Sequence, residues 1–343
     1  MLICPQFYII DNIFIEGFKA NGCEVFLHNY RNYNSVFFER FNSNKSKLPF
    51  KIRSKWEHFY LTIINKKHLE VFNQIRPDLV LVYNNEMLLP ETVKLFKGSA
   101  KIFFFLGDNP YYSQSTNRYN LALLSQADQV LTPDTYWKMQ LEQIGFTNIH
   151  FFASSLSDGS VAAGKISNEE KEKFGSDIIY IGRNYPHSWG YKRTLFLSKL
   201  SDLNLKIYGD KGWEQWIRMF PELNEKLVKS NGRLSHEKVK KIMTCSKIYP
   251  VDANPGILNG LHLRIFECIE NEILPVVEFR KDIDLVFKGV EIPVIYNYNE
   301  CRSIVLKYLE NDTERIRIIK ALKEYAGRYY SPGKSVANVL NLF

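Results

Sequence analysis

The first half of the chain alternates between short apolar runs and amphipathic segments. Apolar runs typical of buried parallel strands lie at 78–84, 101–110, 128–132 and 148–153, with further strand candidates at 1–10 and 23–30. Segments with helical spacing of apolar residues separate them, at 11–22, 68–77, 90–99, 120–127 and 134–145. Asp11 is the expected N-cap of the first helix, and Gly22 its end. This alternation predicts βαβ units and a doubly wound parallel sheet.

The same alternation restarts at 177, after a stretch of small, polar and charged residues. Strands are predicted at 177–182, 204–209, 247–253, 273–279 and 291–297. Helices are predicted at 190–200, 235–246, 261–272, 281–289, 299–312 and 314–330, with Ser235 as an N-cap. We therefore expect an α/β protein of two Rossmann-like domains, spanning 1–155 and 176–325 around a linker at 156–175, that face each other across a cleft.

Composition narrows the class of protein. The chain has 343 residues and a net charge of +8, which fits two soluble domains with an anionic partner or a merely basic surface. The five cysteines form no CxxC pair and the histidines show no ligand spacing, which disfavours a disulfide framework or structural zinc. The first residues do not resemble a signal peptide, and no apolar run approaches the ~20 residues of a membrane span. We expect a cytoplasmic protein.

Residues 44–59 are the densest basic and aromatic stretch of the chain. One interpretation is a solvated loop and helix start. The other is an edge that binds an acceptor or touches a membrane surface.

Arg264 and Glu267 lie three residues apart, on one face of the helix predicted at 261–272. A loop containing Gly256 and Gly260 leads into this helix, and free backbone N–H groups at a helix start attract anions. Arg264 would then clamp a diphosphate, and Glu267 would accept hydrogen bonds from ribose hydroxyls. The alternative is an Arg–Glu ion pair on a solvated helix face.

Other strand ends add candidates for the same site. Gly182 and Arg183 follow the strand at 177–182 and could reach the same phosphates, while Tyr208 and Gly209 end the next strand and could border the base. Asp282 and Asp284 spell a DxD motif, but they begin a predicted helix, so we interpret them as capping and helix-dipole residues and expect no metal.

The order of these segments over roughly 176–330 resembles the nucleotide-binding half of GT-B glycosyltransferases, within the glycosyl transferases group 1. The closest resemblance is to the CgeB-type branch, whose G-x-N-x-R-x-F-E segment stands here as Gly260, His262, Arg264, Phe266 and Glu267. The resemblance implies a donor diphosphate at Arg264, a ribose at Glu267, and a terminal helix at 326–343 packed back on the first domain. His262 replaces the usual Asn, and either contacts a phosphate or the donor sugar or is a substituted packing residue.

The first domain resembles the family more loosely, in an aromatic strand followed by Asp and Pro at 101–112. Asp108 is a candidate general base for the acceptor hydroxyl, or a turn former together with Asn109. Glu86, after the strand at 78–84, is a second candidate base. Tyr111 and Tyr112 are candidates to stack on the acceptor.

The resemblance implies a metal-independent, hexosyltransferase-like enzyme that needs no cofactor besides its nucleotide-sugar co-substrate, with a UDP-sugar as the expected donor. The expected acceptors are a glycan, a glycolipid or a protein, with peripheral contact at the inner face of the membrane. The alternatives are a nucleotide-sugar epimerase or hydrolase, and a catalytically degenerate scaffold protein. No nucleic acid is expected, because no recognised binding module is visible.

Overall fold

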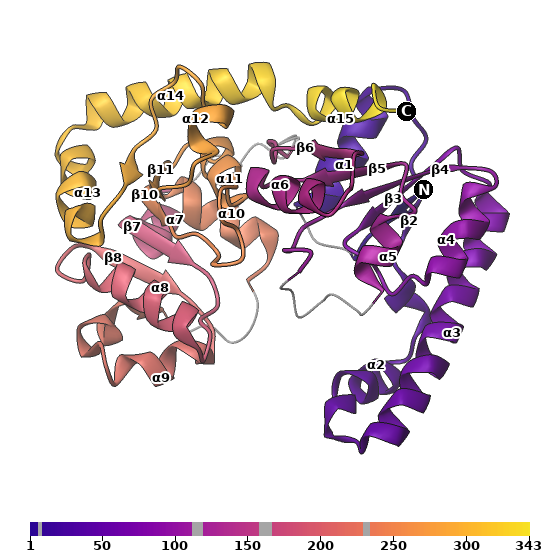
Figure 1. Cartoon of the computed structure of the whole chain (residues 1–343). Helices are drawn as coiled ribbons and strands as arrows, with labels where there is room; N and C mark the ends of the chain where they lie inside the picture. Colours follow the sequence, from indigo (N-terminus) through magenta and orange to yellow (C-terminus); the bar gives the residue numbers. More distant parts are fainter. Residues whose placement is uncertain (6–8, 112–118, 158–166, 229–233) are drawn as a thin grey trace. The chain divides into compact units, whose positions relative to one another are not determined.

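The computed structural model describes residues 1–5, 9–111, 119–157, 167–228 and 234–343. It divides into two compact units, which we call unit 1 (Met1–Ala153 with Gly333–Phe343) and unit 2 (Ser154–Pro332). Each unit contains one six-stranded sheet whose strand pairs are all parallel (Figure 1). The predicted fold class, two Rossmann-like α/β domains, is confirmed.

The sheet of unit 1 has the order β2-β1-β3-β4-β5-β6, so its strand order reverses between β1 and β3. Its strands are β1 (Leu2–Ile3), β2 (Leu27–His28), β3 (Leu79–Tyr83), β4 (Lys101–Phe105), β5 (Gln129–Thr132) and β6 (Ile149–Phe151). Its helices next to the sheet are α1 (Ile10–Ala20), α4 (Pro90–Lys97), α5 (Asn120–Leu124), α6 (Thr135–Gln143) and α15 (Pro332–Leu340). Residues of α1, α15 and four strands share one apolar core.

Asp11 was predicted to cap the first helix, but it does not. The helix begins one residue earlier, at Ile10, and its N-cap residue Ile9 makes no side-chain capping bond. Asp11 lies in the first turn instead, and burial raises the pKa of its carboxyl.

Unit 1 also carries a pair of helices that project away from its sheet, α2 (Val36–Ser43) and α3 (Phe50–Ile75), with the 3-10 turns η1 (Tyr30–Tyr33) and η2 (Lys45–Lys47) (Figure 1). The sequence predicted a helix only at 68–77, but α3 begins 18 residues earlier, after Pro49. Tyr60, Ile64, His68 and Phe72 are its buried residues at intervals of four. The narrow stripe is interrupted by polar types, which hid the helix from the pattern of apolar residues.

The sheet of unit 2 has the order β12-β11-β10-β7-β8-β9, and reverses between β7 and β10. Its strands are β7 (Ser176–Ile181), β8 (Leu205–Tyr208), β9 (Leu227–Val228), β10 (Ser246–Val251), β11 (Leu274–Glu278) and β12 (Val294–Ile295). Its α-helices are α7 (Asn168–Phe174), α8 (Ser188–Ser198), α9 (Glu214–Ile217), α10 (His236–Thr244), α11 (Arg264–Glu270), α12 (Ile283–Val286), α13 (Cys301–Glu310) and α14 (Asp312–Tyr329). Its 3-10 turns are η3 (Lys211–Trp213), η4 (Pro221–Lys226) and η5 (Tyr298–Glu300). Ser235 caps α10 as predicted, accepting a hydrogen bond from the Lys238 N–H.

The segments that connect the two units differ from the expected linker and terminal helix. Part of the predicted linker at 156–175 is the helix α7, which begins with a capping box between Ser167 and Glu170. The predicted helix at 326–343 is broken, because α14 ends at Tyr329 and α15 begins at Pro332. Within the described part of the chain, no helix combines the length and apolar character that a membrane crossing requires.

Candidate functional site

The strand order of unit 2 reverses between β7 and β10, and ligands of open α/β sheets bind beyond the carboxyl ends of strands at such a point. Asp252 follows β10 there and is almost completely buried. Its carboxylate accepts hydrogen bonds from the Tyr180 hydroxyl (2.7 Å) and from Nε of Arg193 (2.9 Å). Burial alone would raise the pKa of Asp252, but Arg193 and Tyr180 hold that pKa below its usual value. The carboxylate is therefore ionised and fixed in place.

Arg193 lies within an aromatic enclosure. Its guanidinium is 4.8 Å from the ring centroid of Trp189, 5.4 Å from that of Tyr180 and 5.6 Å from that of Tyr185. It also donates a hydrogen bond to the carbonyl of Arg183. These contacts fix the loop that follows β7, because one buried cation joins that loop to Asp252.

Gly182, Tyr208 and Gly209, which were predicted to border the donor, lie together at the ends of β7 and β8. The Gly182 N–H donates to the Tyr208 carbonyl (3.1 Å), and the Trp213 indole N–H donates to the Gly182 carbonyl (2.9 Å). A Cβ at Gly209 would lie 2.2 Å from the Trp213 ring, so only glycine fits beneath it. Arg183 is exposed, with Nε 3.9 Å from Asp210.

Arg264 and Glu267 form an ion pair within α11. Their side chains are only 14% and 4% exposed, so the interpretation as a pair on a solvated helix face is wrong. The Arg264 guanidinium also lies 5.5 Å from the centroid of the Tyr249 ring. Burial raises the pKa of Glu267 despite the opposing effect of Arg264. Among the described residues, Oε1 of Glu267 has no hydrogen-bond partner, which leaves a buried acceptor for a ligand hydroxyl.

The first turn of α11 is not the set of free amides that the sequence predicted. The Ile265 N–H donates to the His262 carbonyl, and the Phe266 and Glu267 N–H groups donate to the Leu263 carbonyl. The Arg264 N–H donates to Nδ1 of His262 (3.0 Å). Charge recognition at this helix start therefore falls to side chains rather than to backbone N–H groups.

His262 is a neutral donor in this arrangement. Burial and the neighbouring Arg264 lower the pKa of His262 to about 4. Because Nδ1 accepts the Arg264 N–H, the proton of the neutral ring is on Nε2. The ring can therefore donate one hydrogen bond to an acceptor oxygen such as a phosphate oxygen.

The DxD residues differ from one another in their surroundings. Asp284 is exposed in the first turn of α12, as expected of a helix-dipole residue. Asp282 is buried and stands at the N-cap position of α12, as predicted, but its side chain makes no capping bond. Over the described ranges, no three His, Cys, Asp or Glu side chains gather in a way that could hold a metal ion.

At the carboxyl ends of the strands of unit 1, Asn84 binds the loop that contains Asp108. Asn84 Nδ2 donates to the Asp108 carboxylate (2.9 Å), and Asn84 Oδ1 accepts from the Gly107 N–H (2.7 Å). A Cβ at Gly107 would lie 2.1 Å from the hydroxyl of Tyr83, so this close approach requires glycine. Asp108 is thus a hydrogen-bonded member of a turn, and its carboxylate is half-buried.

Glu86 lies beside the switch point of unit 1, in the loop after β3. It is buried, and its carboxylate accepts a hydrogen bond from the Arg31 guanidinium (3.0 Å). Burial raises the pKa of Glu86 to about 7, even though Arg31 opposes this shift. Asn84, Glu86 and Met87 all have positive φ (53°, 36° and 60°), a conformation that is costly for Glu and Met. Such backbone strain is typical of functional sites.

Two buried histidines form a hydrogen-bonded chain that ends at the backbone of the Glu86 loop. His68 Nε2 lies 3.0 Å from the Glu86 carbonyl, and His28 Nε2 lies 2.9 Å from His68 Nδ1. Burial lowers the pKa of His28 to about 4 and that of His68 to about 3, so both rings are neutral. A carbonyl only accepts, so each ring carries its proton on Nε2 and donates toward Glu86.

The two tyrosines predicted at the acceptor site are only partly covered by the structure. Tyr111 is 42% exposed, and its hydroxyl donates to the Gln140 carbonyl on α6 (3.0 Å). Tyr112 lies outside the described residues.

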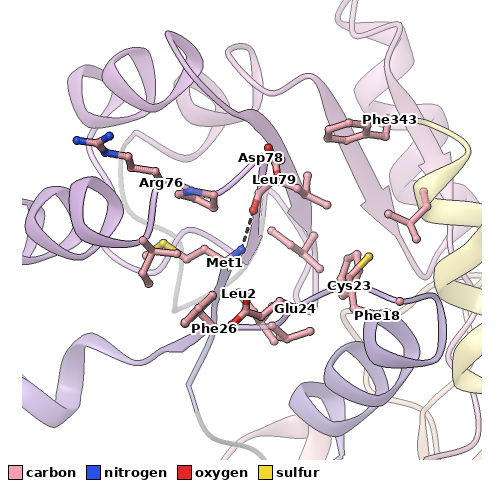
Figure 2. Close-up of a pocket in the computed structure, with 16 residues that line it drawn as sticks. Met1, Leu2, Phe18, Cys23, Glu24, Phe26, Arg76, Asp78, Leu79 and Phe343 are labelled. Carbon is pink, nitrogen blue, oxygen red and sulfur yellow. Dashed lines mark hydrogen bonds between the residues drawn. The ribbon is translucent and has the colours of Figure 1, made fainter.

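A pocket of about 500 Å³ opens at the opposite, amino-terminal edge of the unit 1 sheet (Figure 2). Leu2 and Leu79, the first residues of β1 and β3, are among the residues that line it, and the Met1 amino group donates to the Leu79 carbonyl there (2.7 Å). None of the predicted site residues lines this pocket, so it is not the candidate site.

Five residues at these strand ends were not predicted from the sequence, namely Arg193, Asp252, Arg31, His28 and His68. A signal existed for Asp252, which directly follows β10, as Asp108 follows β4 three residues after its end. The others are brought to the edges by tertiary packing, and no local pattern marks them.

Comparison with known proteins adds to this geometry. A family model described as glycosyl transferase-like matches residues 192–341. The matched stretch contains Tyr208, Gly209, Gly260, His262, Arg264 and Glu267, and it begins after Gly182 and Arg183. No curated protein matches the chain significantly.

Solved structures match the chain over most of its length. An E. coli structure, described as trehalose-6-phosphate bound with UDP-2-fluoro glucose, has a TM-score of 0.65 at 12% identity and covers 99% of this chain and 98% of its own. The N-terminal domain of Candida albicans trehalose-6-phosphate phosphatase gives 0.62 at 10%, covering 92% and 83%. S. aureus TarM, in complex with fondaparinux, alpha-GlcNAc-glycerol and UDP, gives 0.56 at 14%, covering 80% and 57%. The chain therefore has the GT-B fold, and we call residues 192–341, which match the family model, the glycosyl transferase-like region.

Proposed function

We propose that this protein is a glycosyltransferase that binds a nucleotide-sugar donor on unit 2 and transfers the sugar to a hydroxyl of an acceptor bound on unit 1. The observation that carries the proposal is the buried Arg264–Glu267 pair, which lies inside the glycosyl transferase-like region and leaves one carboxylate oxygen without a partner among the described residues. A half-exposed ion pair would need no ligand, whereas a buried carboxylate oxygen needs a hydrogen-bond donor.

The donor diphosphate would be bound by side chains. Arg264 offers a planar guanidinium, His262 offers its Nε2–H, and exposed Arg183 can turn toward the ligand. Glu267 orients Arg264 and accepts hydrogen bonds from the ribose hydroxyls. Negative charge grows on the diphosphate as it leaves, so these donors stabilise the transition state, and the proposed reaction requires no metal ion.

Glu86 is the general base of the proposed reaction. Its pKa near 7 suits proton abstraction at neutral pH, and it lies beside the switch point of unit 1, whereas Asp108 follows the next strand. Glu86 would accept the proton of the acceptor hydroxyl while the acceptor oxygen bonds to the anomeric carbon and the bond to the diphosphate breaks. Asp108 would position the loop through Asn84.

The finer assignments follow the sequence resemblance. We propose a hexosyltransferase with a UDP-sugar donor, in the CgeB-type branch, on the strength of the segment from Gly260 to Glu267. The proposed acceptor is a glycan, glycolipid or protein, and the proposed location is the cytoplasm.

Calorimetry with UDP, GDP, dTDP, CMP and ADP tests the donor site. We expect one nucleotide to bind, and Arg264→Ala to weaken it about 10- to 100-fold, because a charged hydrogen bond contributes about 1.5–3 kcal/mol. The matched control is Arg302→Ala, which removes an exposed arginine of unit 2 paired with Asp202 and should leave binding unchanged.

Two outcomes would contradict the donor site. The first is that no nucleotide or nucleotide sugar binds to the wild-type protein. The second is that Arg264→Ala and Arg302→Ala weaken binding equally, which would indicate a nonspecific charge effect rather than a site at α11.

A further inference from the structure

Residues 33–59 form the end of the helical projection of unit 1, and we call this segment the tip (Figure 1). It exposes seven of the 21 large apolar side chains that are exposed among the described residues. These seven are Tyr33, Val36, Phe37, Phe41, Phe50, Ile52 and Phe59. Because a soluble surface rarely gathers apolar side chains in one short segment, the tip needs an explanation.

Most of the exposed side chains are not needed for the contact between α2 and α3. The two helices already pack through Phe38, Trp56 and Tyr60, with the Phe38 ring stacked 5.2 Å from that of Tyr60. Val36 (85% exposed) and Phe37 (79%) lie on the side of α2 away from this contact. The two helices therefore have an internal interface and a separate outward apolar face.

Two of the outward apolar side chains, Phe41 on α2 and Phe59 on α3, are joined through Trp56. The Trp56 ring lies 4.5 Å from Phe41 on α2 and 5.7 Å from Phe59 on α3, and both phenylalanines are exposed. Ile52 and Phe59 are seven residues apart, so they share one face of α3, with exposed Lys55 between them. Apolar and basic side chains thus alternate on the same surface.

The charge of the tip is strongly positive. Six basic residues lie between 36 and 59, namely Arg40, Lys45, Lys47, Lys51, Arg53 and Lys55. The only two acidic residues of this stretch already have partners, since Glu39 accepts from the Tyr60 hydroxyl (2.8 Å) and Glu57 pairs with Lys45 (3.5 Å). The charge that complements this surface is negative.

We propose that the tip docks on the surface of an anionic lipid membrane. The exposed aromatic and aliphatic side chains enter the headgroup layer, where amphipathic helices bury their apolar faces, and the lysines and arginines contact lipid phosphates. Basic side chains interleaved with apolar ones suit a lipid interface, because the apolar side chains can be buried while the long basic ones keep their charged ends at the headgroups. This proposal does not depend on the glycosyltransferase activity, because docking needs only the tip.

Sedimentation with vesicles tests the proposal directly. The full-length protein is mixed with vesicles of phosphatidylcholine alone or with phosphatidylglycerol added, at low and at high salt. We expect binding only to the anionic vesicles. Phe37→Ser with Phe50→Ser should weaken it at least about ten-fold, because two apolar side chains lose their burial. Lys51→Gln with Lys55→Gln should weaken binding to the anionic vesicles about five-fold per lysine. High salt should also weaken this binding, because it screens the same charges.

The control is Leu285→Ser with Tyr296→Ser, which removes two exposed apolar side chains of unit 2. It should bind as the wild type does. Thermal unfolding of every variant establishes that it is folded, and the substituted side chains are exposed, so the fold should persist.

Three outcomes would overturn the proposal. They are no binding of the wild type to anionic vesicles at low salt, equal binding to neutral vesicles, and equal loss in the tip variant and the control. A wild type that self-associates, with the association lost on Phe37→Ser and no vesicle binding, would show that the tip is a protein interface instead.

Discussion

At the switch point of unit 1, the buried carboxylate of Glu86 has one guanidinium partner, a strained backbone and a pKa raised to about 7. At the switch point of unit 2, the buried carboxylate of Asp252 has an arginine and a tyrosine as donors and a pKa below its usual value. The two sites occupy equivalent places in their sheets. Their difference lies in how completely the charge is compensated, and this suits Glu86 to proton transfer and Asp252 to fixing, through Arg193, the loop that follows β7.

Removing the proposed base should have the largest effect on activity. Glu86→Gln keeps the shape of the side chain but removes the proton acceptor, so we expect sugar transfer to fall about 10²- to 10⁴-fold. Nucleotide binding, measured by calorimetry, should stay at the wild-type level. Glu91→Gln, an exposed glutamate on α4, is the control. Wild-type transfer by Glu86→Gln would exclude Glu86 as the base, and the same substitution at Asp108 would then be the next test.

Removing the fixed charge of unit 2 should chiefly lower stability. Asp252→Ala leaves Arg193 buried without its carboxylate, which costs about 3–5 kcal/mol of the free energy of unfolding. Asp202→Ala breaks an exposed pair with Arg302 and should cost below about 1 kcal/mol. Thermal unfolding of both variants measures the difference. Equal shifts in melting temperature would show that the buried pair stabilises the fold no more than the exposed pair does.

The activity of the wild type should depend on pH in a way that distinguishes the two carboxylates. Glu86 acts as a base only when ionised, and its pKa is about 7. The transfer rate should therefore fall about ten-fold for each pH unit below 7 and level off above it. Asp252 stays ionised throughout this range, so its ion pair with Arg193 should not change. A rate that is flat from pH 5 to pH 8 would contradict the assignment of Glu86.

The smallest expected effect concerns the ribose. Oε1 of Glu267 has no partner among the described residues, so a ribose hydroxyl would complete its hydrogen bonding. The wild type should bind a nucleoside diphosphate about ten-fold more tightly than its 2′-deoxy analogue. Glu267→Gln should reduce this ratio toward one, as calorimetry with both ligands can measure. An unchanged ratio in the variant would place the ribose elsewhere.

The sequence predicted those elements whose burial is local. The strands β3 and β4 have both faces covered, so their apolar runs were unmistakable. The helix α3 was mostly missed, because a narrow stripe of Tyr, Ile, His and Phe gives little apolar contrast. The two-residue strand β9 is too short to carry any periodicity.

The candidate sites divide in the same way. Arg264 and Glu267 lie within one helical turn, so their spacing predicted a shared face, although only the structure shows that the pair is buried. Arg193 and Asp252 are 59 residues apart and meet through packing of α8 against the sheet, which no local pattern encodes. Glu86 was a candidate from its place after a strand, but its raised pKa depends on burial that the sequence does not reveal.

The return of α15 to unit 1 affects the order in which the protein can fold during synthesis. Val336 and Val339 belong to the core that also contains Leu2 and Phe14, so the ribosome makes the first and last parts of one core about 330 residues apart. At about 5–20 residues per second, the beginning of unit 1 waits for its closing helix for roughly 15 to 70 seconds. Unit 2 is contiguous in sequence, so it can complete its own core before unit 1 does, although unit 1 begins earlier in the chain. In a growing chain, the nascent unit 1 is therefore the part that needs protection from aggregation.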